Sequence, residues 1–188
     1  MNLPHRLCRL YAVAGNAVEG ALAFWLPGLL ARFVFAATLW FYFLNSALTK
    51  VGPGITGFFM VRDGAYYQIA LPAVEAAGGD ISQVPFLWHL VVYLGTYAEF
   101  LLPLMVVLGL LTRLSALGMT VFIAVQIMVD ITVHQVGPET IGALFDRFPD
   151  AVILDQRLLW LFPLAYLIIH GPGLISVDGL AGRVLCRR

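Results

Sequence analysis

The sequence predicts an all-α membrane protein: a bundle of four transmembrane helices, together with an N-terminal segment suited to an interfacial helix. Hydrophobic residues make up 61% of the 188 residues and charged residues only 12%. Soluble domains average about 45–50% apolar and about 25% charged residues. Four apolar segments are long enough to cross a bilayer, and the basic residues gather on one side of the resulting topology. The chain length suits one domain.

Three parts are expected along the chain: an N-terminal segment (1–25), the transmembrane domain (26–175) and a C-terminal tail (176–188). The N-terminal segment lacks the continuous apolar run and small-residue cleavage site of a signal peptide. Its portion from Leu10 to Trp25 fits two interpretations. It is either a helix lying at the membrane interface with Glu19 facing water, or an extension of the first span.

The four spans follow from helix geometry. A helix rises about 1.5 Å per residue, so about 20 residues cross a hydrocarbon core of about 30 Å. The first span is predicted to begin at Pro27, whose missing N–H suits a helix start, and to end at Lys50. The remaining spans are predicted at residues 86–111, 114–136 and 157–169, the last with an extension to 175 as an alternative.

The distribution of lysine and arginine predicts the orientation. Seven of the eleven basic residues lie in the three regions that share one side of a four-span protein. They are Arg6, Arg9, Arg32, Arg113, Arg183, Arg187 and Arg188. The two long loops on the opposite side, 51–85 and 137–156, contain seven acidic residues and two arginines. By the positive-inside rule, both termini are predicted to be cytoplasmic.

Three stretches of the chain resemble the DoxX family of small bacterial membrane proteins. They are Arg32–Lys50 followed by Val51-Gly52, Ala98-Glu99 followed by Leu108-Gly109-Leu110-Leu111-Thr112-Arg113, and Gly171-Pro172-Gly173-Leu174-Ile175-Ser176-Val177-Asp178. The resemblance covers about Ala31 to Gly179; the long N-terminal segment and the large outer loops depart from a typical member. It implies a bacterial inner-membrane location and a redox or stress setting, with a quinone as candidate cofactor and the proteins of a redox complex as partners.

Polar side chains inside the predicted spans form two layers when depth is counted from the cytoplasmic end. One layer, at about 18–20 Å, contains Asn45, Glu99 and Gln126. A second layer, at about 24–27 Å, contains Lys50 and Asp130. The outer half of the bundle is therefore predicted to be polar and the inner half dry.

Glu99 has two interpretations, because ionisable groups inside a membrane are costly and are usually either paired or functional. The functional one is a proton-accepting carboxylate in a ligand or quinone pocket, with Asp130 as a second proton-transfer group. The structural one is a pair with Lys50, or hydrogen bonds to Asn45 and Gln126.

Asp130 and His134 stand one helical turn apart, on the same face of the third span as Gln126. Together with His89, at a similar height, they are a candidate metal site, because imidazole and carboxylate suit zinc, copper or iron. The alternative is a simple Asp130–His134 hydrogen bond at the water interface. Arg157, at the start of the fourth span, is expected to reach the headgroups. It joins Asn45, Lys50, Gln126 and His134 as a candidate binding residue.

These residues favour a membrane subunit of a quinone-linked or stress-related oxidoreductase system. No haem, flavin or iron–sulfur motif is visible, so the sequence leaves open whether the chain is itself an enzyme or a non-catalytic subunit. The alternatives are a small metal-handling or transport protein, for which four spans favour a homodimer, and a scaffold. Zero net charge and the absence of nucleotide-binding and hydrolase motifs speak against nucleic-acid-binding and soluble-enzyme functions. Cys8 and Cys186 form no C-x-x-C pair.

Overall fold

The computed structural model describes residues 3–185, and every regular element within that range is a helix. The long helices are α1 (Leu3–Leu22), α2 (Leu26–Lys50), α6 (Phe86–Leu108), α7 (Thr112–Thr132) and α9 (Leu158–His170). The short ones are α3 (Gly54–Phe58), α4 (Asp63–Ile69), α5 (Leu71–Ala76), η1 (Ile81–Gln83), α8 (Pro138–Ile141), η2 (Val152–Arg157) and α10 (Val177–Leu185). Cys186 and the last two arginines lie outside the described residues.

Four helices are long and apolar enough to cross a membrane, so the predicted multi-pass all-α membrane fold is confirmed. They are α2, α6, α7 and the continuous segment Val152–His170, which joins η2 to α9. The fourth span begins five residues before the predicted start at Arg157, with a turn of π-helix in η2. The third span ends at Thr132, before the predicted end at 136, and Gln135 has a positive φ.

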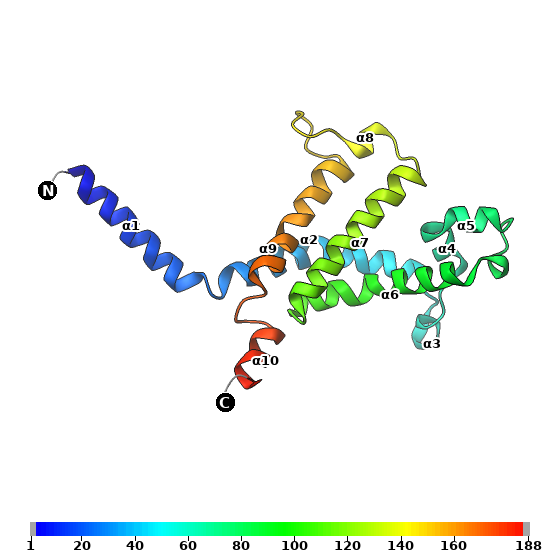
Figure 1. The fold of residues 1–188 in the computed structure, drawn as a ribbon, viewed down its shortest axis with the longest axis horizontal. Coiled ribbons are helices and arrows are strands. Elements are labelled where there is room, and N and C mark those ends of the chain that lie inside the picture. The colour runs from blue at the N-terminus through cyan, green and yellow to red at the C-terminus, as the bar shows by residue number, and fades with distance from the viewer. Residues whose placement is uncertain (1–2, 186–188) are drawn as a thin grey trace.

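The four spans form two pairs. Helix α2 packs against α6, and α7 packs against α9, while contacts of α2 with α9 and of α6 with α7 close the ring. Figure 1 shows the pairs joined at one end and diverging at the other. We call the joined end the base; it contains the start of α2, the α6–α7 turn and the end of α9. The opposite end, which holds α3–α5 and α8, is the loop end.

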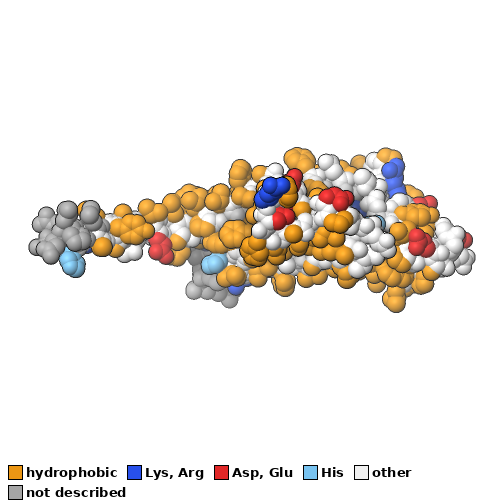
Figure 2. Space-filling model, turned by 90° about the horizontal axis from the view of Figure 1, so that it is seen from above, with side chains coloured by type: hydrophobic (Ala, Val, Ile, Leu, Met, Phe, Trp, Pro, Cys, Tyr) orange, Lys and Arg blue, Asp and Glu red, His pale blue; other side chains and the backbone are white. Residues whose placement is uncertain are grey.

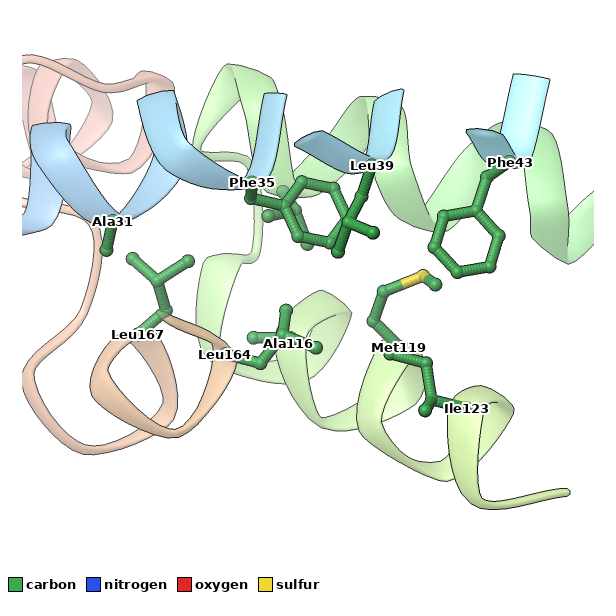
Figure 3. Close-up of a cluster of buried hydrophobic side chains, with 10 residues drawn as sticks. Ala31, Phe35, Leu39, Phe43, Ala116, Met119, Ile123, Leu164 and Leu167 are labelled. Carbon is green, nitrogen blue, oxygen red and sulfur yellow. The ribbon is translucent and has the colours of Figure 1, made fainter. Parts of the chain in front are cut away.

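The main core lies between the four spans, in the half of the bundle nearer the base. Its buried residues are Ala31, Phe35, Leu39, Phe43, Val106, Ala116, Met119, Ile123, Leu164 and Leu167. The α2 side chains recur at four-residue intervals, which places them on one face of the helix. Figure 3 shows them pointing toward Met119 and Ile123 of α7 and toward the two leucines of α9. The inner half of the bundle is thus largely apolar; the buried polar side chains there lie at the base and are Arg32, Thr112, Ser115 and Ser176.

A second, smaller core lies at the loop end, where α4 and α5 pack over α6. It contains Ala65, Tyr66, Ala70, Ala73, Val74, Val84 and Val92. Helix α4 makes its main contacts with α2 and α6 among the spans. The loop end of α7 and α9 is covered separately, by α8 packed against η2.

Helix α1 is a separate element and not an extension of the first span. It ends at Leu22, and a turn over residues 23–25 precedes α2. Figure 1 shows α1 projecting away from the bundle. Of the two interpretations of this segment, extension of the span is therefore wrong.

Close backbone contact joins the start of α2 to the segment after α9. A Cβ atom on Gly28 would lie 2.5 Å from the carbonyl carbon of Pro172. Gly171 and Gly173, on either side of that proline, both have positive φ, a conformation that side-chain-bearing residues rarely adopt. The Gly171-Pro172-Gly173 motif thus ends the fourth span, as predicted, and also turns the chain against α2.

We expect the substitution Gly28→Ala to destabilise the bundle by about 1–3 kcal/mol, because the added methyl group overlaps the backbone of residue 172. The measurement is the midpoint of thermal unfolding in detergent. Gly20→Ala is the matched control, since a Cβ there meets nothing within 4 Å, and alanine favours a helix by about 0.5–1 kcal/mol over glycine. Equal midpoints for the wild type and Gly28→Ala would contradict the close approach.

Candidate functional site

The central feature of the site is a buried ion pair between α2 and α6. The Nζ atom of Lys50 lies 2.8 Å from Oε2 and 3.1 Å from Oε1 of Glu99. The ammonium group also donates to Oγ of Ser46, at 2.7 Å. Lys50 is 3% exposed and Glu99 is 6% exposed, so both charges are removed from solvent. Each is satisfied by the other, which is the usual condition for charge inside a bilayer.

Local helix properties support the position of each partner. Lys50 is the last residue of α2, where the partial negative charge of the helix C-terminus stabilises a cation. Glu99 lies on the buried face of α6, and Pro103 stands four residues later in the same helix. Because proline has no N–H, the backbone carbonyl of Glu99 lacks its usual helical donor. The carboxyl group therefore sits beside an interrupted stretch of helix.

The predicted central layer of Asn45, Glu99 and Gln126 does not form a cluster, although the three residues were placed at similar depth. Asn45 is exposed, and Nε2 of Gln126 donates to the hydroxyl of Tyr42 at 3.0 Å. Of the interpretations of Glu99, the pair with Lys50 is the one that the contacts support. The hydrogen bonds expected to Asn45 and Gln126 are not formed, because Asn45 lies on the exposed face of α2 and Gln126 donates to Tyr42 instead.

A second ion pair connects α7 with the start of the fourth span. Nη2 of Arg157 lies 2.5 Å from Oδ2 of Asp130. Arg157 is 3% exposed, so the expectation that it reaches the headgroups is wrong. Its guanidinium faces the ring of Trp160, 6.0 Å from the ring centre. Its Nε and Nη1 atoms are buried without a protein partner.

The three candidate metal ligands are dispersed. Nδ1 of His89 lies 2.6 Å from the hydroxyl of Tyr66, in the second core, while Asp130 pairs with Arg157 and His134 is exposed. The alternative Asp130–His134 hydrogen bond is also not formed. Within residues 3–185, no three His, Cys, Asp or Glu side chains are grouped as metal ligands would be. Burial raises the pKa of the Tyr66 hydroxyl, and nearby Tyr93 and Asp63 raise it further.

A third polar cluster holds the base together. Nη1 of Arg32 donates to the carbonyl of Val107 at 2.9 Å, and Nη2 donates to the carbonyl of Ile175. Arg32 therefore ties the start of α2 to the end of α6 and to the segment after α9. Arg32 was predicted only as one of the basic residues that set the orientation, and its burial was not predicted. The signal that could have identified it is its position six residues inside α2, within the hydrophobic span.

Asp178 completes the base cluster by capping α7. Its carboxylate accepts hydrogen bonds from the backbone N–H groups of Leu111 and Thr112, both at 2.8 Å, and from the Thr112 hydroxyl at 2.7 Å. From the sequence, Ser176 and Asp178 are both candidates to cap the turn in which they lie. The helix that Asp178 caps is instead α7, whereas Ser176 does cap α10, because its Oγ accepts the N–H of Gly179 at 2.9 Å.

The carboxyl of Asp178 is held in its charged form. Burial by itself would raise its pKa, but the hydrogen bonds from Thr112 and Leu111 and the charge of Arg32 together lower the pKa below the ordinary value of 3.8. The start of α7 adds a favourable partial positive charge. Asp178 is thus an acceptor for α7 over the physiological pH range.

The three stretches that resemble the DoxX family meet in these clusters. Arg32, the Gly109–Thr112 turn and the segment up to Asp178 form the base cluster, in which Asp178 N–H also donates to the carbonyl of Gly109 at 2.9 Å. Lys50 and Glu99 form the central pair. No protein-family model, curated protein or solved structure is significantly similar to the chain.

The Lys50–Glu99 pair places a carboxylate, a group able to accept a proton, inside a membrane-spanning bundle. A proton on that carboxylate would leave a neutral acid beside an ammonium group that Ser46 still contacts. The ammonium group would then lack its counter-ion, so the uptake would carry the cost of one unpaired buried charge.

We expect single substitutions in this pair to be more damaging than a double one. Lys50→Met leaves an uncompensated buried carboxylate, and loss of one partner of a buried pair costs about 3–5 kcal/mol. The double variant Lys50→Met/Glu99→Met removes both charges, and we expect most of the lost stability to return. The measurement is a double-mutant cycle of unfolding midpoints in detergent. Additive losses, with the double variant the least stable, would show that the two side chains are not coupled.

Asp178→Asn should lower stability by about 1 kcal/mol at pH 7, because the amide lacks the negative charge that interacts with the start of α7. The pKa of Asp178 is lowered on folding, so its contribution is complete above the ordinary value of 3.8 and disappears as pH falls through the lower folded value. Unfolding midpoints of the wild type and the variant should therefore converge under acid conditions. A difference that stays constant down to pH 2 would contradict this assignment.

Proposed function

We propose that the chain is a DoxX-like inner-membrane subunit of an oxidoreductase system, with both termini in the cytoplasm. In this proposal Glu99, held by Lys50, exchanges the protons that accompany reduction or oxidation of a quinone. Electrons come from a partner enzyme, because the chain itself has no haem, flavin or iron–sulfur motif. It is therefore a non-catalytic subunit that handles protons and binds its partners within the bilayer.

The observation that carries the proposal is the burial of Lys50 and Glu99 inside a membrane-spanning bundle. Ionisable residues are rare in transmembrane helices and commonly mark proton or ligand pathways. A purely structural tie between α2 and α6 would not need charge, since replacing a buried ion pair by apolar residues is often neutral or stabilising. Retention of a carboxylate at this depth therefore favours a chemical role.

The base cluster supports the family part of the proposal. The residues on which the resemblance rests come from distant parts of the chain, yet they make mutual contacts at the base and in the central pair. Such convergence is expected if these motifs together determine the fold of a family. The excess of arginine at the base supports the cytoplasmic orientation.

In this proposal the chain contributes only proton transfer to the reaction. Reduction of a quinone to a quinol would take up two electrons and two protons. The partner enzyme would supply the electrons, and a protonated Glu99 would supply the protons one at a time. The carboxylate formed after each transfer is stabilised by the ammonium group of Lys50, 2.8 Å away, until the next proton arrives.

The test compares Glu99→Gln with the wild type in nanodiscs loaded with a quinone. We expect the purified wild type to retain quinone on extraction. We also expect quinone reduction to change the infrared absorption of a carboxyl group, and Glu99→Gln to abolish that change. Glu75→Gln is the matched control, since Glu75 is exposed on α5. Absence of bound quinone, together with an unchanged carboxyl signal in Glu99→Gln, would contradict the proposal.

A further inference from the structure

Helix α1 carries an apolar stripe that no part of the described chain covers. Every residue from Cys8 to Ala21 is exposed. At 100° per residue, Leu10, Ala14, Val18 and Ala21 share one face. The opposite face carries polar residues, namely His5, Arg9, Asn16 and Glu19. Figure 2 shows apolar side chains along much of the projecting α1.

Helix α10 has the same character. Val177, Leu180 and Val184 follow a spacing of three and four residues, which places them on one face of the helix. All three side chains are exposed, and Val184 has the largest exposed fraction, 76%. Arg183 is also exposed and flanks the stripe, about 90° around the helix from its centre. Residues 176–188 were predicted only as a cytoplasmic tail. The amphipathic helix α10 within them is a finding of the structure.

The two helices leave the bundle from one place. The N–H of Leu174, in the segment before α10, donates to the carbonyl of Phe24, in the turn after α1, at 3.3 Å. Gly173 lies against the backbone of Trp25, where a Cβ would be 3.0 Å from the carbonyl oxygen. The α1–α2 turn and the α9–α10 segment are thus clasped at the base, where the spans begin and end.

We propose that α1 and α10 together form a collar that lies in the membrane surface around the base and recognises anionic lipid headgroups. Each helix connects to a span through a short segment at the base, so its apolar stripe lies close to the end of a span. An amphipathic helix in that position lowers its free energy by burying its apolar face among the acyl chains. This inference does not depend on the proposed redox function.

The charge of the collar determines the kind of lipid. Residues 1–25 and 176–188 contain five arginines and two acidic residues. One of the two acids, Asp178, is already engaged by Leu111 and Thr112. These two segments are therefore cationic, with Arg6, Arg9 and Arg183 inside the two helices; each arginine near an anionic membrane surface contributes about 1 kcal/mol of attraction. A zwitterionic membrane surface provides no such electrostatic attraction.

The test measures which helix faces touch lipid, using the full chain with Cys8 and Cys186 replaced by serine. Single cysteines carry an environment-sensitive fluorophore at Ala14→Cys or Leu180→Cys on the stripes. Asn16→Cys and Gly182→Cys are the matched controls on the polar faces; a Cβ at Gly182 meets nothing within 4 Å. Each protein is reconstituted in phosphatidylglycerol or phosphatidylcholine vesicles whose acyl chains carry a nitroxide quencher.

We expect a blue shift and several-fold stronger quenching at the two stripe positions than at the two controls, more pronounced in phosphatidylglycerol and reduced by salt. Equal quenching on both faces of each helix would overturn the collar. A blue shift at the stripe positions that is seen only at high protein-to-lipid ratio and without quenching would also overturn the collar. That result would show instead that the stripes bind a second copy of the chain. Equal quenching in the two lipids would overturn the recognition of anionic headgroups.

Discussion

The buried guanidinium of Arg32 is the interaction on which the arrangement of the spans depends. It joins the start of α2 to the carbonyl groups of Val107 and Ile175, at the ends of elements that are distant in sequence. A buried cation without acceptors would be strongly destabilising, so the α6–α7 turn and the segment after α9 must meet at this point. Asp178 then links the same segment to the first turn of α7. All four spans are thereby held at the base.

From that fixed base the two helix pairs diverge, and each pair carries its own ion pair. Lys50–Glu99 joins α2 to α6, and Asp130–Arg157 joins α7 to the start of the fourth span. The two are not equivalent. Both oxygens of Glu99 accept from Lys50, whereas Arg157 leaves two of its nitrogen atoms without protein acceptors. In the first pair the two charged groups are satisfied by each other, whereas the second pair retains donors without a protein partner.

The proposed proton chemistry and the proposed lipid collar occupy opposite parts of the same molecule. The ion pair lies toward the loop end, beyond the apolar core of the bundle, and the collar surrounds the base. Contact of α1 and α10 with a bilayer surface would set the depth of α2, since only the turn at residues 23–25 separates α1 from it. The depth of α2 in turn sets the depth of Lys50 at its far end, and hence the level at which protons are exchanged.

The sequence by itself determined the membrane class and the number of spans, and it offered the Lys50–Glu99 pair as one of the alternatives for Glu99. Long apolar segments have few alternatives to a transmembrane helix, because lipid satisfies no backbone hydrogen bonds. Lys50 as a structural partner of Glu99 followed from the cost of leaving either charge alone in that environment. The end of the fourth span at Gly171-Pro172-Gly173 followed from the chemistry of those residues.

Only the tertiary structure decided which polar residues at similar depth are neighbours. Counting residues along each span gives height but neither rotation about the helix axis nor separation between helices, so Asn45 and Gln126 were placed beside Glu99 although they do not contact it. The burial of Arg157 depends on the start of the fourth span, which a turn of π-helix moves to Val152. The base cluster depends on contacts between residues more than 60 positions apart in the sequence. No local sequence pattern specifies such contacts.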